Sequence, residues 1–393
     1  MRSSIRAISA VVLGLSVASV VLGGASSRGA DARATRSLQQ VCSWKRLPSA
    51  DPHARWYDAL ESVSMVSARG GWAVGQYYSG REGGPSGPFV ERWNGKRWRS
   101  AKLSIPGGSA LWSVAASRSS DVWAVGSAYV GGPLMEHWDG SSWSRVRLPR
   151  VVAPILHAVA ARTSSDAWTV GAHEQNGFGK TLAEHWDGRR WTAVPTPNPS
   201  AAPSRQPYAL LQAVTVISAT DVWAAGYAGV RKPTPTARPL VEHWNGQRWR
   251  IAPTPGVRSG RVLNDILFSI SGSGSNDVWA VGSWGAVAGG YGGLGDHPLT
   301  LHWDGSAWKR VPTPAMSDRA IFYGVVARAR VAWAVGDRGV QPRQRPLIER
   351  WDGRSWSTAA SPGGFSLSDV GITPGGTVWA VGAAGRRPLA ARC

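Results

Sequence analysis

The sequence has few charged residues, few acidic residues in particular, and only two cysteines. Charged residues make up 17% of its 393 positions, which excludes a disordered polar chain and a long coiled coil. Asp and Glu number 24 against 44 Lys and Arg, so the formal net charge is +20, although only six of the 44 are Lys. This Arg preference is as typical of a codon-biased genome as of a selected basic surface. Two cysteines are too few for a disulfide-rich scaffold.

Motifs for metal, phosphate and nucleophilic chemistry are also absent. The sequence contains no Cys-x-x-Cys, His-Glu-x-x-His or calcium-loop pattern, so we expect neither a metal nor a cofactor. The glycine-rich run over 288–295 opens no helix and is predicted to be a flexible loop. Once the two cysteines are paired, as argued below, no nucleophile candidate remains. We expect no specific nucleic-acid partner, because the basic charge accompanies no nucleic-acid-binding module; it fits non-specific attraction to anionic polymers or cell walls.

Long hydrophobic runs are lacking except at the N-terminus. Arg2 and Arg6 precede an apolar stretch over 7–22 and small residues follow it, which is the pattern of a secretory signal peptide. We therefore predict a signal peptide over 1–27, a disordered leader over 28–40 and a secreted, extracellular protein. The alternative is an uncleaved membrane anchor. We expect no other membrane-spanning segment.

Tryptophan, in contrast, is abundant, and most of the 23 tryptophans belong to a repeated unit. One string, Val/Ala-Trp-Ala/Thr-Val/Ala-Gly, recurs seven times, centred on Trp72, Trp123, Trp168, Trp223, Trp279, Trp333 and Trp379. A second, Trp-Asn/Asp-Gly-x-x-Trp, occurs six times, at Trp93/Trp98, Trp138/Trp143, Trp186/Trp191, Trp244/Trp249, Trp303/Trp308 and Trp351/Trp356. With Trp44, the two strings account for 20 of the 23, and only Trp56, Trp112 and Trp284 lie outside them.

Each repeat predicts four short strands. Runs rich in Val and Trp are separated by Gly, Pro, Asp and Ser, the Asp-Gly and Asn-Gly pairs are strong hairpin signals, and no stretch has helical periodicity. Four-stranded units about 45 to 56 residues apart are typical of propeller blades. We predict an all-β, seven-bladed β-propeller over 41–393, with four antiparallel strands per blade. The expected blades are 49–98, 99–143, 144–191, 192–249, 250–308, 309–356, and 357–393 together with 42–48.

The two ends of the repeat array complement each other. The last unit stops before its fourth strand, and residues 42–48 match that missing strand, so the N-terminal strand is predicted to complete the seventh blade. In this alignment Cys42 and Cys393 flank a hairpin turn, where cross-strand Cα atoms lie about 4.5–5.5 Å apart. That separation suits a disulfide, so we predict a Cys42–Cys393 bond that closes the ring.

Length variation among the repeats is confined to one face. The hairpin tryptophans are always five residues apart, whereas the connection between the second and third strands varies, from 15 residues (Trp123 to Trp138) to 24 (Trp279 to Trp303). Strands within a blade alternate in direction, so the variable loops share one rim, which we call the long-loop face and where functional residues are expected. Near the start of the innermost strands, residues that differ between repeats should line the mouth of the central channel: Glu61, Trp112, His157, Gln212, Phe268, Tyr323 and Ser368. With Trp56, Trp284 and Tyr291, the first six of these are the candidate ligand-binding residues.

Glu and His recur directly before the third-strand tryptophan. His137, His185, His243 and His302 occupy a position where other repeats have Arg, and a Glu precedes it in five repeats. Such pairs resemble metal ligands, but each stands in a different blade. We therefore expect them to stabilise the blades.

The repeats, with Asp-Val-Trp-Ala-Val-Gly followed by Glu-His-Trp-Asp-Gly-x-x-Trp, resemble those of uncharacterised secreted bacterial propellers over about residues 42–393. They are more distantly similar to tectonin-type lectin propellers. The Gly-x-x-Trp hairpin resembles the Asp-box of sialidases, but Asp139 is adjacent to Gly140 rather than two residues before it, and no Arg triad stands out. Kelch and galactose-oxidase propellers share the architecture without the Gly-Gly signature. The Trp-Asp pair lacks the Gly-His partner of WD repeats.

We interpret the chain as a monomeric, non-enzymatic binding module whose ligand is a carbohydrate or cell-surface polymer on the long-loop face. Aromatic and polar groups at a channel mouth suit stacking on a sugar or holding an extended peptide. One alternative is a glycoside hydrolase or lyase, which would need two converging carboxylates, with Glu61 and Asp296 the first candidates. The other is a scaffold for an extracellular protein, which a flat apolar patch would favour.

Overall fold

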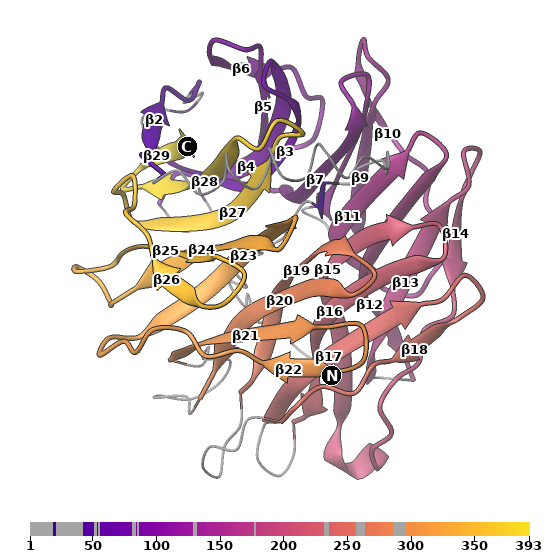
Figure 1. The fold of residues 1–393 in the computed structure, drawn as a ribbon. Helices are drawn as coiled ribbons and strands as arrows, with labels where there is room; N and C mark the ends of the chain where they lie inside the picture. The colour runs from indigo at the N-terminus through magenta and orange to yellow at the C-terminus, as the bar shows by residue number, and fades with distance from the viewer. Residues whose placement is uncertain are drawn as a thin grey trace, which may run out of the picture.

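The protein is a seven-bladed β-propeller, as its sequence predicts (Figure 1). The computed structural model describes residues 19–20, 42–50, 53, 56–80, 84, 86–128, 132–176, 178–231, 236–256, 264–285 and 296–393. Among these, no helix is long and apolar enough to cross a membrane. The predicted signal peptide (1–27) and leader (28–40) lie outside the described residues, except for β1 (Ser19–Val20). This strand pairs in parallel with Ala160 and Ala161 at the inner edge of the third blade.

Each blade is an antiparallel sheet of four strands. Blade 1 contains β3 (Tyr57–Ser67), β4 (Gly70–Tyr78), β5 (Ser86–Trp93) and β6 (Trp98–Ala101); blade 2 contains β7 (Ala110–Arg118), β8 (Asp121–Ser127), β9 (Pro133–Trp138) and β10 (Trp143–Arg145). Blade 3 contains β11 (Ile155–Thr163), β12 (Asp166–Gln175), β13 (Phe178–Trp186) and β14 (Trp191–Val194); blade 4 contains β15 (Pro207–Ser218), β16 (Asp221–Val230), β17 (Thr236–Trp244) and β18 (Trp249–Ile251). Blade 5 contains β19 (Ile266–Gly274), β20 (Asp277–Trp284), β21 (His297–Trp303) and β22 (Trp308–Arg310); blade 6 contains β23 (Ala320–Arg328), β24 (Val331–Arg338), β25 (Arg345–Trp351) and β26 (Trp356–Thr358). Blade 7 contains β27 (Ser366–Ile372), β28 (Val378–Ala384), β29 (Arg387–Arg392) and β2 (Lys45–Leu47).

The observed blades extend slightly beyond their predicted ends. In blades 1 to 6 the fourth strand begins at the second hairpin tryptophan and continues for two or three residues. The predicted blade ends at 98, 143, 191, 249, 308 and 356 therefore coincide with the first residue of that strand rather than its last. The tryptophan marks the end of the hairpin turn, and the strand itself extends for as long as it pairs with the third strand. A short 3-10 turn (Pro203–Arg205) precedes blade 4.

The ring closes as predicted, with strands from both ends of the array in one sheet. Strand β2 pairs antiparallel with β29, placing Lys45 opposite Arg392. The backbone of Cys393 exchanges two hydrogen bonds with Val378 on β28. The Cα atoms of Cys42 and Cys393 are 5.5 Å apart, and the two residues form a disulfide that spans 351 positions of the sequence. The disulfide prediction is therefore confirmed.

The repeated tryptophans pack between blades as well as within the hairpins of blades 1 to 6. The second-strand tryptophan of one blade contacts both hairpin tryptophans of the next; Trp72, for example, lies 5.0 Å from Trp138 and 5.3 Å from Trp143 between ring centroids. Equivalent clusters form at five further junctions, including that of Trp379 with Trp93 and Trp98. Edge-on contacts between large buried rings favour one orientation of neighbouring blades, so the tryptophan repeat fixes the geometry of the ring.

The recurring histidines complete a second repeated arrangement, this time within the blade. In blades 2 to 5 the second strand begins with Asp, and Nε2 of the third-strand His lies 2.7–2.9 Å from an oxygen of that carboxylate. The same imidazole packs on the blade's tryptophan, with centroids 4.0 Å apart for His137 and Trp123. Blades 1, 6 and 7 lack the Asp and carry Arg92, Arg350 and Arg392 over the tryptophan instead. The histidines thus make contacts within their own blades, as a blade-stabilising role predicts.

Candidate functional site

The seven variable residues of the innermost strands occupy one structural position, a β-bulge. In each first strand the ladder skips one residue close to the long-loop face, and the skipped residue is Glu61, Trp112, His157, Gln212, Phe268, Tyr323 or Ser368. A bulge leaves a residue out of the pairing and re-aims its side chain. First strands of adjacent blades contact one another, so the bulges form a ring around the channel.

Members of this ring contact each other between neighbouring blades. Trp112 stacks on His157 with centroids 5.4 Å apart, and Phe268 lies 5.7 Å from Tyr323. Glu61 accepts a hydrogen bond of 3.0 Å from Gln76. Trp112 is half-buried, whereas the six other bulge residues are only 2–8% exposed. Six of the seven bulge residues are therefore largely buried, and Trp112 is the most exposed of them.

Burial also shifts the pKa values of three of these bulge residues. It raises the pKa of Glu61 to about 7, against a smaller opposing effect of the hydrogen bond from Gln76. It lowers the pKa of His157 to about 4, so this imidazole is neutral at pH 7. Burial likewise raises the pKa of Tyr323 well above its ordinary value. These groups belong to different blades, and the described residues show no hydrogen bond or ion pair between Glu61 and His157 that would make them an acid–base pair.

Trp56 lies in an aromatic cluster before blade 1. Its ring stacks on those of His53 and Tyr77, at centroid distances of 5.4 and 5.1 Å, and His53 also contacts the carboxylate of Asp58. The neighbouring Tyr57 carries the guanidinium of Arg386 above its ring at 4.6 Å. Trp56 is thus half-buried by the side chains around it. The more exposed aromatic–cation pair at this place is Tyr57 with Arg386.

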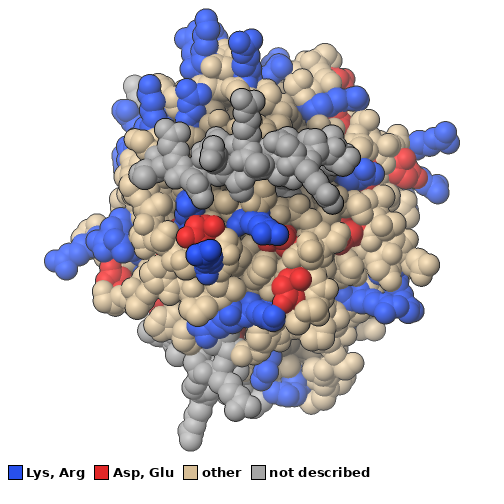
Figure 2. Space-filling view, in the orientation of Figure 1, with Lys and Arg blue, Asp and Glu red and all other residues tan. Residues whose placement is uncertain are grey.

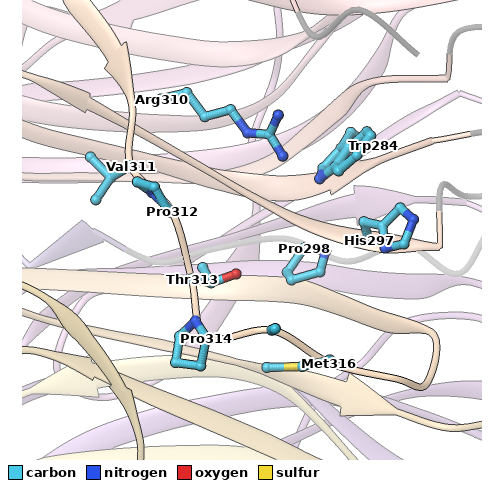
Figure 3. A pocket seen from close by; sticks show the side chains of 10 residues that line it. Trp284, His297, Pro298, Arg310, Val311, Pro312, Thr313, Pro314 and Met316 are labelled. Atoms are coloured by element: carbon cyan, nitrogen blue, oxygen red, sulfur yellow. The ribbon is translucent and has the colours of Figure 1, made fainter.

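Trp284, one of the candidate residues, lines a cavity, which is drawn in Figure 3. The cavity of about 430 Å³ lies between the end of β20, the start of β21 and the linker that follows β22. Its walls are Trp284, His297, Arg310 and the linker residues Pro312, Pro314 and Met316. The guanidinium of Arg310 lies over the indole at 4.3 Å, and the His297 ring is 4.6 Å from it. Arg310 could not be predicted as a site residue from the sequence, because its position in the repeat is that of an ordinary fourth-strand residue.

A second cavity on the long-loop face, of about 390 Å³, lies at blades 3 and 4. Lys180, Arg205 and Arg238 line it together with Tyr208. The hydroxyl of Tyr208 donates a 3.0 Å hydrogen bond to the Thr236 carbonyl, and the guanidinium of Arg231 lies 5.3 Å from its ring. An aromatic ring and cations again lie together here, at positions that carry no site signal in the sequence.

Two other sequence predictions concern Tyr291 and Asp296. Tyr291 lies outside the described residues. Glu61 and Asp296 belong to blades 1 and 5. Glu61 is buried, and the side-chain contact of Asp296 is with His297 at 3.5 Å. No group of three or more His, Cys, Asp or Glu that could hold a metal ion occurs within the described part of the chain.

Comparison with known proteins establishes the fold. No family model matches the sequence, and no curated protein matches it. The chain is similar to the solved structure of YCF48 bound to D1 peptide (14% identity, TM-score 0.54, covering 89% of this chain and 94% of that one). It is also similar to the WD40 propeller of Doa1 (11%, 0.54, covering 90% and 96%) and to virginiamycin B lyase from Staphylococcus aureus (11%, 0.54, covering 89% and 98%). At these identities the likeness shows a shared β-propeller architecture.

Proposed function

We propose that the protein is a secreted, non-enzymatic binding protein that holds an acidic carbohydrate polymer of a cell surface on its long-loop face. The Trp284–Arg310 pair carries this proposal, because it joins an aromatic ring to a cation at the wall of a cavity. Aromatic rings stack on the apolar faces of sugars, and a guanidinium binds a carboxylate through paired hydrogen bonds. A uronic-acid unit carries both an apolar sugar face and a carboxylate on one ring.

Repetition of the same pair on this face supports a polymeric ligand. Tyr208 with Arg231, and Tyr57 with Arg386, combine an aromatic ring and a guanidinium at 5.3 and 4.6 Å. All three aromatic residues stand at strand ends that point to the long-loop face. A chain of acidic sugars that engages several weak sites gains affinity through effective concentration.

The test is binding of oligogalacturonate, with a neutral oligogalactose as the comparison ligand, at low and moderate salt. We expect Trp284→Ala and Arg310→Gln to weaken oligogalacturonate binding at least about tenfold (about 1.4 kcal/mol). Arg250→Gln is the matched control, because it removes an exposed cation from the outer strand of blade 4. Equal losses in all three variants, or binding that disappears entirely at moderate salt, would reduce the interaction to net charge and overturn the proposal.

The non-enzymatic part of the proposal has its own measurement. Prolonged incubation of the protein with polygalacturonate should release no new reducing ends and no unsaturated products. Release of either would establish a hydrolase or lyase instead.

A peptide ligand is the second candidate, favoured by the apolar linker wall of the same cavity. Pro312, Pro314 and Met316 offer little hydrogen bonding and suit an extended, apolar peptide segment. A propeller of similar fold, YCF48, is described in complex with a peptide. Binding of an extended peptide with an acidic end that depends on Trp284, without binding of oligogalacturonate, would select this function.

A further inference from the structure

The junction of blades 1 and 2 carries a concentration of arginine that the other blades lack. Three positions of the repeat lie around the short turns, on the rim opposite the long-loop face, and in blade 1 they are Arg69, Arg92 and Arg99. In blade 2 the same positions hold Ser120, His137 and Ser144, and in blade 3 they hold Ser165, His185 and Thr192. Among the seven blades, only blade 1 has Arg at all three positions.

Two adjoining cavities meet at these side chains. One, of about 510 Å³, is lined by Arg92, Arg99 and Lys102 together with Ser141 and Ser142 of the next blade. The other, of about 490 Å³, is lined by Arg69, Arg92, Arg99 and Asn94. Lys and Arg also gather along the upper edge of the molecule in Figure 2, where Figure 1 places β5 and β6.

Arg92 is held in place by the tryptophan cluster beneath it. Its guanidinium lies 5.3 Å from the ring of Trp72 and 5.7 Å from that of Trp138, which belongs to the neighbouring blade. Cation–π contacts on two rings fix the position of the head group while leaving its N–H donors at the surface. Arg92 therefore offers pre-positioned donors between the two cavities.

Blade 1 lacks the carboxylate that blades 2 to 5 place beside the third-strand side chain at the position of Arg92. In blades 2 to 5 an Asp begins the second strand and binds the third-strand side chain, whereas blade 1 has Gly70 there. Within the described residues, Arg69, Arg92, Arg99 and Lys102 take part in none of the ion pairs, which involve other cations such as Arg145 and Arg162. Four cations thus line two adjoining cavities, and none of the four has an ion-pair partner among the described residues.

We infer that this junction, defined by Arg69, Arg92, Arg99 and Lys102, binds the sulfate or phosphate ester group of a polysaccharide. Guanidinium groups bind tetrahedral oxyanions through paired, charge-assisted hydrogen bonds, and the hydroxyl of Ser142 supplies a neutral donor at the same wall, whereas that of Ser141 donates to Asp139. The site lies on the rim opposite Trp284 and does not depend on the ligand proposed for the long-loop face.

The experiment compares a carrageenan-derived sulfated hexasaccharide, which contains no uronic acid, its desulfated form and inorganic phosphate by titration calorimetry at about 0.15 M salt, where long-range attraction is screened. The double variant Gly70→Asp/Arg92→His gives blade 1 the Asp–His pair of blades 2 to 5. A Cβ at Gly70 would approach Val66 to 3.3 Å, a contact that requires only a small shift. Arg99→Gln, at an exposed position, is a second variant that leaves the packing intact.

We expect both variants to weaken binding of the sulfated hexasaccharide about tenfold or more, and Arg250→Gln, at the position of Arg99 in blade 4, to change it less than twofold. Binding of the hexasaccharide but not of phosphate assigns the site to an ester on a polymer, and saturable binding of phosphate as well assigns it to the oxyanion itself. No binding by the wild-type chain, or an equal loss in Arg250→Gln, overturns the inference. Trp284→Ala should have no effect on this titration, so failure here is distinguishable from failure of the long-loop-face ligand.

Discussion

The indole of Trp333 lies edge-on against that of Trp44, with ring centroids 6.1 Å apart, at the junction between blades 6 and 7. At the other junctions the second-strand tryptophan meets two tryptophans, but here the place of the third-strand tryptophan is taken by Cys393, which is bonded to Cys42. Both cysteines and Trp44 pack against the same buried cluster as Trp333. The disulfide thus replaces one ring of the repeated cluster with a covalent bond.

Removing this disulfide should lower the stability of the whole ring. The bond closes a loop of 351 positions, and the chain-entropy model gives roughly 5 kcal/mol for a loop of that size. We expect Cys42→Ser/Cys393→Ser to lower the denaturant midpoint strongly, and reduction of the wild-type protein to have the same effect. Equilibrium unfolding in denaturant with and without reductant measures it. Equal midpoints for oxidised and reduced protein would contradict the role assigned to this bond.

Truncating a tryptophan of the interblade clusters should be far more costly than truncating one outside them. Trp279 is fully buried and contacts Trp351 and Trp356 of the next blade at 4.9 and 5.0 Å. We expect Trp279→Ala to destabilise the fold by about 3–5 kcal/mol. Trp56→Ala removes a half-buried ring and is the matched control, with an expected loss well below that range. Similar losses for both, measured by thermal unfolding, would mean that the clusters have no special structural role.

The Asp–His pairs predict a loss of stability in acid. Burial opposes ionisation of Asp221, but hydrogen bonds from His243, Ser275 and Trp223 outweigh it, so the pKa lies below its ordinary value of 3.8. The pair therefore contributes fully above pH 3.8 and its contribution is lost as the pH falls through the lowered pKa. We expect Asp221→Asn to lose about 1–3 kcal/mol at pH 7 and progressively less below pH 3.8. Asp318→Asn, on the surface, is the control; a loss for Asp221→Asn that grew on acidification would contradict the assignment.

Glu349 predicts that folding stability falls as the pH rises, the opposite of the pH dependence expected from Asp221. Its side chain is fully buried, no hydrogen-bond partner of its carboxyl oxygens is found among the described residues, and burial raises its pKa from 4.5 to about 8. Because ionisation is disfavoured in the folded state, stability should fall between pH 4.5 and about 8, with a slope of up to about 1.4 kcal/mol per pH unit. Glu349→Gln should make this decline shallower, because Glu61 and Glu242, whose pKa values burial raises to about 7 and about 8, still contribute to it. Glu174→Gln, at an exposed site, should leave the decline unchanged. Unfolding measured at several pH values tests this prediction. If stability declined with pH just as steeply in Glu349→Gln as in the wild type, the decline would be assigned to other groups.

The blade count, the closing strand and the disulfide were predictable because each depends on an exact repeat. A tryptophan every 45 to 56 residues shows both the unit and the fragment that completes it, so Cys42 and Cys393 could be paired by alignment alone. The His–Asp pairing was predictable only in part. His137 was assigned to blade stability, but its partner Asp121 was overlooked, although the signal was present: every repeat with that Asp has His, and every repeat without it has Arg.

The site was less predictable because it depends on packing between non-repeated residues. Alignment placed Glu61, Trp112 and His157 at equivalent positions, but a β-bulge arises from twist and pairing across the sheet and has no sequence signature in these repeats. Arg310 approaches Trp284 only because the fourth strand and the second strand end on the same rim. The loops that determine such contacts differ from blade to blade, so no repeat could be used to infer them.

The tryptophan clusters also give the molecule an optical signature. Indole rings held about 5 Å apart at steep angles, as Trp72 is with Trp138 and Trp143, couple their electronic transitions and pass excitation energy between blades. The far-ultraviolet circular dichroism of the folded ring should therefore contain an exciton couplet that no short-stranded sheet would give by itself. Loss of the part of this couplet that comes from contacts between blades would report separation of neighbouring blades directly, without any added probe.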